Sequence, residues 1–200
     1  LRGFNPTIFD PELEISQNFF GQVSSAATLK TFDVDKVNEV LSNDLDKYYH
    51  AKFQLTPTFS VRHFSLGILY RNEISAIKNS ASAMDTQAYE DLGIFLGANY
   101  NFWSGRIKLG ATLKAVNRIE VNDAALNTTG SLALGTIASE GTAVAGDVGL
   151  ILQAPVVYLP TLAIVARDIG DTKYDSSSGL RLNTGTRRPQ EVKQSYDVGI

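Results

Sequence analysis

The 200-residue chain contains no cysteine. Disulfide bonds, thiol catalysis and thiolate metal sites are therefore excluded. Histidine is almost as scarce, since His50 and His63 are the only two. Neither belongs to a His-x-x-x-His spacing or a carboxylate–histidine cluster, so we expect no metal site. His63 is expected at a tight turn, exposed or at a membrane interface.

The sequence also lacks long apolar runs and basic clusters. No run approaches the roughly 18 apolar residues of a membrane-spanning helix. The formal net charge is −3, and with no basic cluster there is no reason to expect nucleic acid as a partner. The chain begins at Leu1 without a signal peptide, so any export signal is expected outside this numbering.

Sequence motifs of catalysis are absent as well. The segment Gly130-Ser131-Leu132-Ala133 lacks the glycines that flank the nucleophile of a serine hydrolase. The glycines are not spaced as a phosphate-binding loop. Asn127-Thr128-Thr129 matches a glycosylation acceptor, which is a frequent chance match. We therefore expect neither enzymatic activity nor a cofactor.

What is present is strict alternation, clearest over residues 91–121. Apolar residues alternate there with polar residues or glycine on both sides of a turn at Trp103-Ser104. Period two is typical of a strand with one apolar and one polar face. Folding about this turn sets Leu96 opposite Ala111. The arms are about twice the usual strand length of roughly 5–6 residues, which favours a membrane barrel.

Two more hairpins are predicted. The first spans 51–74 and turns at Arg62-His63, which sets Lys52 opposite Glu73 and Gln54 near Arg71 on its polar face. Pro57 is expected to interrupt its hydrogen-bond ladder.

The last predicted hairpin spans 143–173 and turns at 155–160. It sets Asp147 across from Arg167, and we expect these two to form an ion pair. Weaker alternation over 13–23 and 192–200 predicts further strands, about seven or eight in all.

One segment has helical periodicity. Its apolar residues Val34, Val37, Leu41, Leu45 and Tyr48 are spaced three or four apart. This spacing predicts a short amphipathic helix over 33–48, within a long loop.

Loop lengths and aromatic residues support the barrel. Short connections at 62–63, 103–104 and 155–160 alternate with long ones at 24–50, 75–88, 122–142 and 174–191, as in outer-membrane barrels with tight periplasmic turns. Aromatic residues gather near the strand ends and are expected at the membrane interfaces. They are Phe64, Phe102, Trp103, Tyr158, Tyr174 and Tyr196.

The polar face is expected to line the barrel lumen. Its charged residues are Lys52, Arg71, Glu73, Arg106, Lys108, Lys114, Arg118, Glu120, Asp147 and Arg167. They form either a structural ion-pair network or a polar pathway. A file of glycines is expected on the same face, namely Gly67, Gly93, Gly97, Gly110, Gly149 and Gly199. A secreted β-sandwich is the soluble alternative, because its strands also alternate.

Several short motifs resemble a known family. GFNPTIFD at 3–10, GDVG at 146–149, ARDIGDT at 166–172 and RRPQ at 187–190 are similar to segments of the FadL/TodX outer-membrane proteins and the related PorV and barrel-type conjugal-transfer TraF proteins. Thr7 stands where that family usually has alanine. The resemblance implies one domain over 1–200, an antiparallel up-and-down transmembrane β-barrel. It also implies about fourteen strands, with the remainder outside these residues.

The resemblance leaves two functions open. One is FadL-like passage of small hydrophobic molecules across the bacterial outer membrane. The other is a PorV-like scaffold that docks another envelope protein through its long loops. Membrane lipid is an expected partner in both cases.

Overall fold

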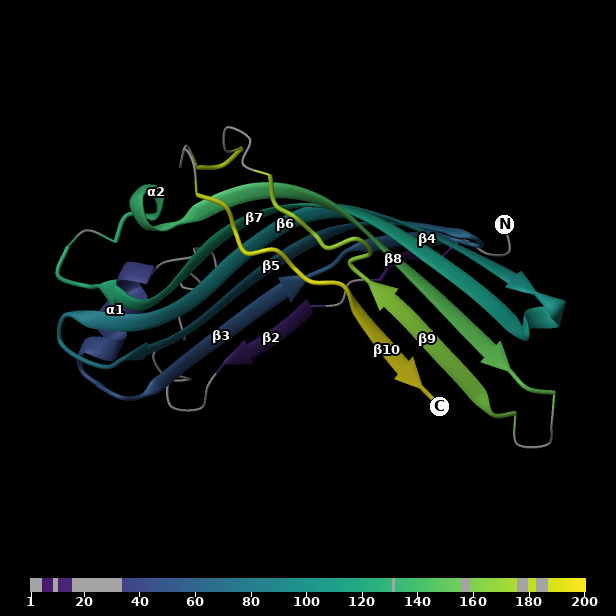
Figure 1. The fold of residues 1–200 in the computed structure, drawn as a ribbon, viewed down its shortest axis with the longest axis horizontal. Coiled ribbons are helices and arrows are strands. Elements are labelled where there is room, and N and C mark those ends of the chain that lie inside the picture. Colours follow the sequence, from purple (N-terminus) through teal and green to yellow (C-terminus); the bar gives the residue numbers. More distant parts are fainter. Residues whose placement is uncertain are drawn as a thin grey trace.

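The computed structural model describes residues 5–8, 11–15, 34–130, 132–155, 159–175, 180–182 and 187–200. They form one ten-stranded antiparallel sheet in the order β1-β4-β5-β6-β7-β8-β9-β10, with β3 also pairing with β5 and β2 pairing with β3 (Figure 1). The strands are β1 Asn5–Ile8, β2 Pro11–Ile15, β3 Tyr48–Leu55, β4 Thr58–Val61, β5 Phe64–Lys78, β6 Ala83–Phe102, β7 Ile107–Asn127, β8 Ser139–Gln153, β9 Thr161–Arg167 and β10 Ser195–Gly199. The predicted all-β, antiparallel class is confirmed, but the described residues form ten strands instead of the predicted seven or eight.

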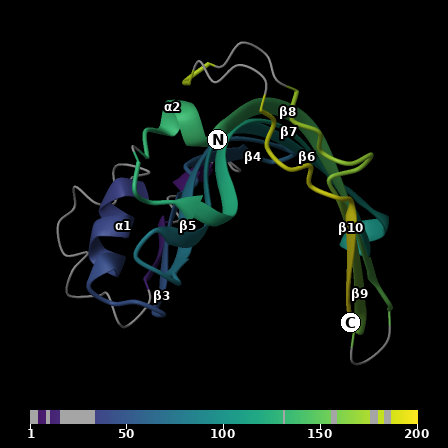
Figure 2. The ribbon, with the colours of Figure 1, turned by 60° about the vertical axis from the view of Figure 1, so that its left-hand side comes forward.

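The sheet curves into an arch and, over the described residues, does not close on itself (Figure 2). The turns β4–β5, β6–β7 and β8–β9 lie together at one end, which we call the hairpin end. Helix α1, Val34–Ser42, lies at the opposite end, the helix end, and outside the arch (Figures 1 and 2). A second, one-turn helix, α2, covers Leu134–Ile137.

The central hairpin is longer than predicted, and its register differs by two residues. Strands β6 and β7 pair from Phe102↔Ile107, so Leu96 faces Leu113 instead of Ala111. The cause is the turn, which takes four residues, Trp103 to Arg106, with Trp103 and Ser104 at positive φ. A two-residue shift preserves the side-chain face, so the predicted apolar and polar faces are unchanged.

The pairing predicted for the first hairpin is confirmed. Lys52 pairs with Glu73 and Gln54 with Arg71, and the turn lies at Arg62-His63. The chain leaves the ladder between Leu55 and Thr58, around Pro57, as the missing N–H of proline requires.

The predicted long loop at 75–88 is wrong. Strand β5 continues to Lys78 and β6 begins at Ala83, leaving a tight connection. Small and polar residues form strand here because one face is covered: Ile74, Ala76 and Ala88 are buried. The alternation of short and long connections therefore has an exception. The long connection predicted at 122–142 is shorter than expected, since β7 runs to Asn127 and β8 starts at Ser139. The one predicted at 174–191 is longer, since β9 ends at Arg167 and β10 starts at Ser195.

Helix α1 ends six residues earlier than the predicted segment. Asp46 adopts a positive φ of 61°, and its N–H donates to the Lys78 carbonyl, which stops the helix and starts β3. Leu45 and Tyr48 are consequently outside the helix and exposed.

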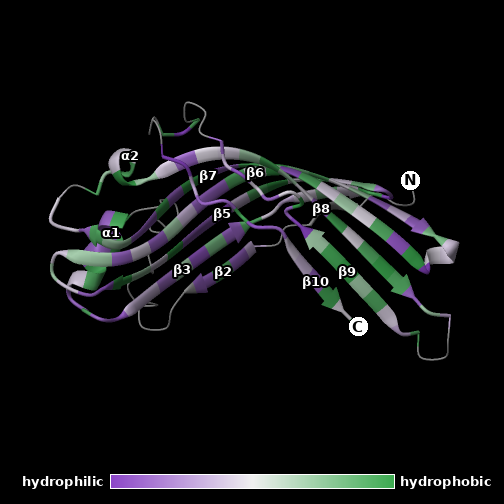
Figure 3. Ribbon diagram, in the orientation of Figure 1, coloured by the Kyte–Doolittle hydropathy of each residue, from purple (hydrophilic) through white to green (hydrophobic). Residues whose placement is uncertain are grey.

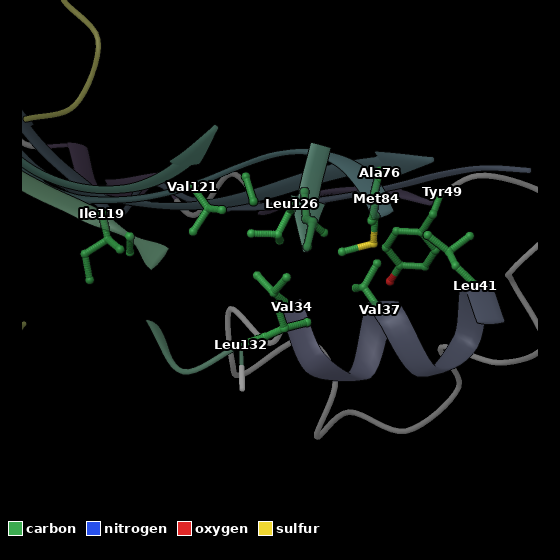
Figure 4. Close-up of a cluster of buried hydrophobic side chains, with 13 residues drawn as sticks. Val34, Val37, Leu41, Tyr49, Ala76, Met84, Ile119, Val121, Leu126 and Leu132 are labelled. Carbon is green, nitrogen blue, oxygen red and sulfur yellow. The ribbon is translucent and has the colours of Figure 1, made fainter. Parts of the chain in front are cut away.

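The hydrophobic core lies between α1 and the sheet (Figure 4). Val34, Val37 and Leu41 of the helix point toward side chains of the sheet that include Tyr49 and Met84. Leu41 and Met84 have no exposed surface, and burying one such side chain stabilises the fold by about 1.5–3 kcal/mol. Within the described residues, no helix is long and apolar enough to span a membrane.

Candidate functional site

The pairing of β5 to β8 fixes two faces of the sheet. Register is continuous from Phe64↔Ala98 to Lys78↔Met84, so alternate residues of β5 share one face throughout. We call the face that carries α1 the outer face and the other the inner face. Residues Leu66, Leu96, Leu113 and Gly146 are neighbours across four strands on the outer face.

Toward the hairpin end the outer face is apolar and uncovered, and we call this region the apolar band. Figure 3 shows hydrophobic residues alternating with less hydrophobic ones along these strands. The large apolar side chains named below are 36–66% exposed, for instance Ile94 at 56% and Val144 at 66%. Its exposed members are Phe59, Val61, Phe64, Leu66, Ile68, Leu92, Ile94, Leu96, Tyr100, Phe102, Leu109, Leu113, Val144, Val148 and Ile164. Solvent-exposed apolar surface of this extent is unusual for a water-soluble monomer.

A belt of polar residues ends the apolar band on the outer face. The Arg181 guanidinium donates to the Glu90 carboxylate at 2.7 Å and to Asn117 Oδ1 at 2.7 Å. Asn117 donates to Glu140, which also accepts the backbone N–H groups of Arg181 and Leu182 at 2.9 and 2.6 Å. Residues 180–182, which we call the crossing segment, are thereby fixed to strands β6, β7 and β8.

No sequence pattern had indicated this belt. Glu90, Glu140 and Arg181 lie 41 to 91 positions apart along the chain. The only available signal was that polar residues replace the apolar ones of the outer face at Glu90 and Asn117.

The inner face carries one ion-pair cluster near its middle. The Lys114 ammonium lies 3.1 Å from Asp147 Oδ1 and 2.9 Å from Asp168 Oδ1. The predicted pair of Asp147 with Arg167 is wrong: β8 and β9 have the predicted register, but Arg167 instead pairs with Asp197 of β10 at 2.7 Å. The β10 strand, unfinished in the sequence pattern, supplied the competing carboxylate.

A second cluster lies nearer the helix end. Arg118 forms a bidentate salt bridge with Asp91, in which Nε donates to Oδ1 at 2.7 Å and a terminal nitrogen donates to Oδ2 at 2.8 Å. Its guanidinium lies between the rings of Tyr89 and Tyr174, 5.0 and 4.9 Å from their centroids. Bidentate pairing with a carboxylate, combined with stacking on aromatic rings, is a geometry that arginine favours when partly buried.

By register, all but one of the remaining predicted charges, Glu120 included, lie on the inner face. Arg71 and Glu73 form a pair at 2.6 Å on the inner face. Lys52, opposite Glu73, contacts Glu12 of β2 at 2.8 Å. Lys108 also lies on the inner face by register. Arg106 does not: it lies in the β6–β7 turn, exposed at the hairpin end.

Between these side chains the inner face forms a groove of about 560 Å³. Its lining includes Gly97, Gly110 and Gly149 together with Lys114, Asp147 and Asp168. The register places the predicted glycine file on this face. Packing requires a glycine at position 93, because an added Cβ would lie 2.7 Å from the Ala115 carbonyl oxygen.

Three predicted interface aromatics lie together at the hairpin end. Phe64, Phe102 and Trp103 are 65%, 44% and 70% exposed. Tyr100 stacks on His63 and makes a tilted ring contact with Phe102. His63 lies at the turn as predicted, with Nδ1 3.1 Å from the Asn99 carbonyl. Tyr174 is buried against Arg118, so its assignment to the aromatic belt was wrong. Tyr158 lies outside the described residues.

The described residues contain no metal-binding cluster, and the chain has no match among known proteins. Among the described residues, no group of three or more His, Asp or Glu side chains could hold a metal ion. No family model, no curated protein and no solved structure matches this chain.

Proposed function

We propose that this chain forms part of the wall of a bacterial outer-membrane β-barrel. The observation that carries the proposal is the apolar band. In β6 it runs from Leu92 to Phe102, about 11 residues, and transmembrane strands need roughly 9–11. At about 3.3 Å per residue and 45° of tilt, this stretch spans about 25 Å, the height of the apolar band of such barrels.

The two ends of the apolar band agree with membrane boundaries. Exposed Trp103 and Phe102 end it at the hairpin end, where aromatic residues favour the interface. Arg181, Glu90 and Glu140 end it on the other side. The strands continue beyond this belt, where α1 covers the same face. A β-sandwich would instead cover the apolar band with a second sheet.

Passage of small hydrophobic molecules is the activity we propose for the barrel. The groove of about 560 Å³ on the inner face supplies room. The same face carries Leu69, Phe95 and Val116 by register, partly exposed and able to contact an apolar solute.

A scaffold role is the second candidate, and the ion pairs favour it. The contacts of Lys114 with Asp147 and of Arg118 with Asp91 occupy the charges of the inner face. A lumen filled by paired charges would be structural, and the helix end would then dock another envelope protein.

The test of the membrane proposal uses the single tryptophan, Trp103. The full chain is mixed with vesicles of phosphatidylcholine brominated on its acyl chains, which quench nearby tryptophan. We expect strong quenching for the wild-type chain. Leu96→Arg, on the outer face, should lose about 2–4 kcal/mol of stability in the bilayer, measured by urea unfolding.

Thr112→Arg is the matched control, because Thr112 neighbours Leu113 but lies on the inner face. It should change stability much less than Leu96→Arg. Equal effects of the two variants, or a water-soluble monomer without quenching, would refute the membrane proposal. Uptake of a fluorescent fatty acid into vesicles then separates passage from the scaffold role.

A further inference from the structure

The hairpin end has an unbalanced charge. Residues 56–66, 95–112 and 148–166 contain no Asp or Glu, although the chain has 21 acidic residues. The pairs Phe64↔Ala98, Ala111↔Val148 and Val148↔Ala166 bring these three ranges together. They contain Arg62, Arg106 and Lys108, for which the described residues provide no ion pair. In a protein of net charge −3, strands β4 to β9 thus carry basic and no acidic side chains at this end. The nearest acidic residue of β10, Asp197, lies on the inner face and pairs with Arg167.

Arg106 lies at the mouth of an apolar groove on this end. The groove has a volume of about 480 Å³, and its lining includes Trp103, Ile107, Leu152 and Leu162. Arg106 is its one charged side chain among the described lining residues. Ile107, Leu152 and Leu162 are neighbours on the outer face, so the groove continues the apolar band.

The turn holds the cation in place. The Arg106 guanidinium lies over the Trp103 ring, 5.9 Å from its centroid. The Arg106 N–H donates to the Trp103 carbonyl at 3.2 Å, and its own carbonyl accepts from Gln153 at 2.8 Å, which ties the turn to β8. Arg118 and Lys114 have carboxylate partners at 2.7 and 2.9 Å. Arg106, in contrast, forms no ion pair with any of the described residues.

We propose that this groove binds an anionic glycerophospholipid. The lipid phosphate accepts hydrogen bonds from the Arg106 guanidinium, whose planar donors match a phosphate. One acyl chain lies along Ile107, Leu152 and Leu162, and Arg62, exposed in the β4–β5 turn at the same end, adds positive potential. The groove volume falls in the roughly 300–1,000 Å³ range of small-molecule sites. This inference rests on the proposed membrane location.

The test compares two brominated lipids beside Trp103. The full chain is reconstituted in unlabelled phosphatidylcholine that contains a small fraction of brominated phosphatidylglycerol or, separately, brominated phosphatidylcholine. One cation near an anionic lipid contributes about 1 kcal/mol, so we expect about fivefold enrichment of phosphatidylglycerol next to Trp103. Arg106→Gln should bring quenching by the two lipids to parity, and Arg106→Lys should retain most of the preference.

Arg167→Gln is the matched control. Arg167 is also an exposed arginine, but it pairs with Asp197 on the inner face, so this variant should keep the full preference. Equal quenching of the wild-type chain by both lipids, or an unchanged preference in Arg106→Gln, would overturn the lipid site and leave the membrane proposal intact. Displacement of the lipid by inorganic phosphate alone would also overturn it. Absence of quenching by either lipid would instead contradict the membrane location itself.

Discussion

At the residue scale, the ion pairs of the inner face differ in burial, and burial decides how much each stabilises the fold. The side chain of Asp91 is 4% exposed and that of Arg118 is 16% exposed. Removing one partner of a buried pair leaves an uncompensated charge, which costs about 3–5 kcal/mol. Pairs between exposed side chains contribute about 0–1 kcal/mol.

We therefore expect Arg118→Ala to lower the free energy of unfolding by about 3–5 kcal/mol. Arg167→Ala is the control, because Arg167 and Asp197 are 59% and 57% exposed, and it should cost at most about 1 kcal/mol. Urea unfolding in lipid vesicles, followed by Trp103 fluorescence, measures both. Similar losses for the two variants would show that Asp91 is hydrated without Arg118.

Residue types predicted the faces of the strands more reliably than the partners of individual side chains. Alternation alone assigns Lys114, Arg118 and Asp147 to one face, because period two is a local property. It does not assign Lys114 to Asp168 or Arg167 to Asp197. These partners lie on segments whose positions depend on the turns between them.

At the scale of elements, helix α1 depends on the sheet, and the sheet depends on the helix. Nine residues are too few for a stable isolated helix in water. Its three buried residues, Val34, Val37 and Leu41, are therefore needed to hold it against β3, β5 and β6. In turn, the helix covers Ala76 and Met84, which allows polar sequence around residues 75–88 to remain strand.

We expect Leu41→Ala to destabilise the helix end by about 2–5 kcal/mol, because it leaves a cavity in a fully buried site. Leu45→Ala is the control. Leu45 was predicted on the same helix but is 48% exposed, so its loss should be within about 0.5 kcal/mol. Hydrogen exchange of the α1 and β5 amides gives the readout. A large effect of Leu45→Ala would place the end of α1 later than Ser42.

At the scale of the whole molecule, the crossing segment joins parts that are distant in sequence. Glu140 is buried, and burial raises the pKa of its carboxyl. The hydrogen bonds from Asn117 and from the backbone of Arg181 and Leu182 lower that pKa more, so the net shift is below the usual 4.5. A lowered pKa means that the charged carboxylate favours the folded state.

The lowered pKa makes the stability contributed by Glu140 depend on pH. Stability due to Glu140 should be complete above pH 4.5 and lost as the pH falls through its lowered pKa. We expect Glu140→Gln to cost about 1–3 kcal/mol at neutral pH, since it removes hydrogen bonds to a charged group. The difference from wild type, measured by urea unfolding at several pH values, should shrink at acid pH. Glu39→Gln, at an exposed position of α1, should show no such trend.

The sequence by itself determined the three hairpins, the two faces of their strands and the register of two of them. Alternation is local, and a turn of two residues such as Arg62-His63 leaves only one register, so Lys52 opposite Glu73 followed from the residues alone. The tertiary structure decided what local patterns do not contain. The left-handed turn at Trp103 and Ser104 moved the central register by two residues. Cover by α1 extended β5 and β6, and contacts 41 to 91 positions apart fixed Arg181 on the outer face. The sequence alone showed that Arg106 is basic. Only the fold placed it beside an apolar groove, at the end where β4 to β9 carry no acidic residues.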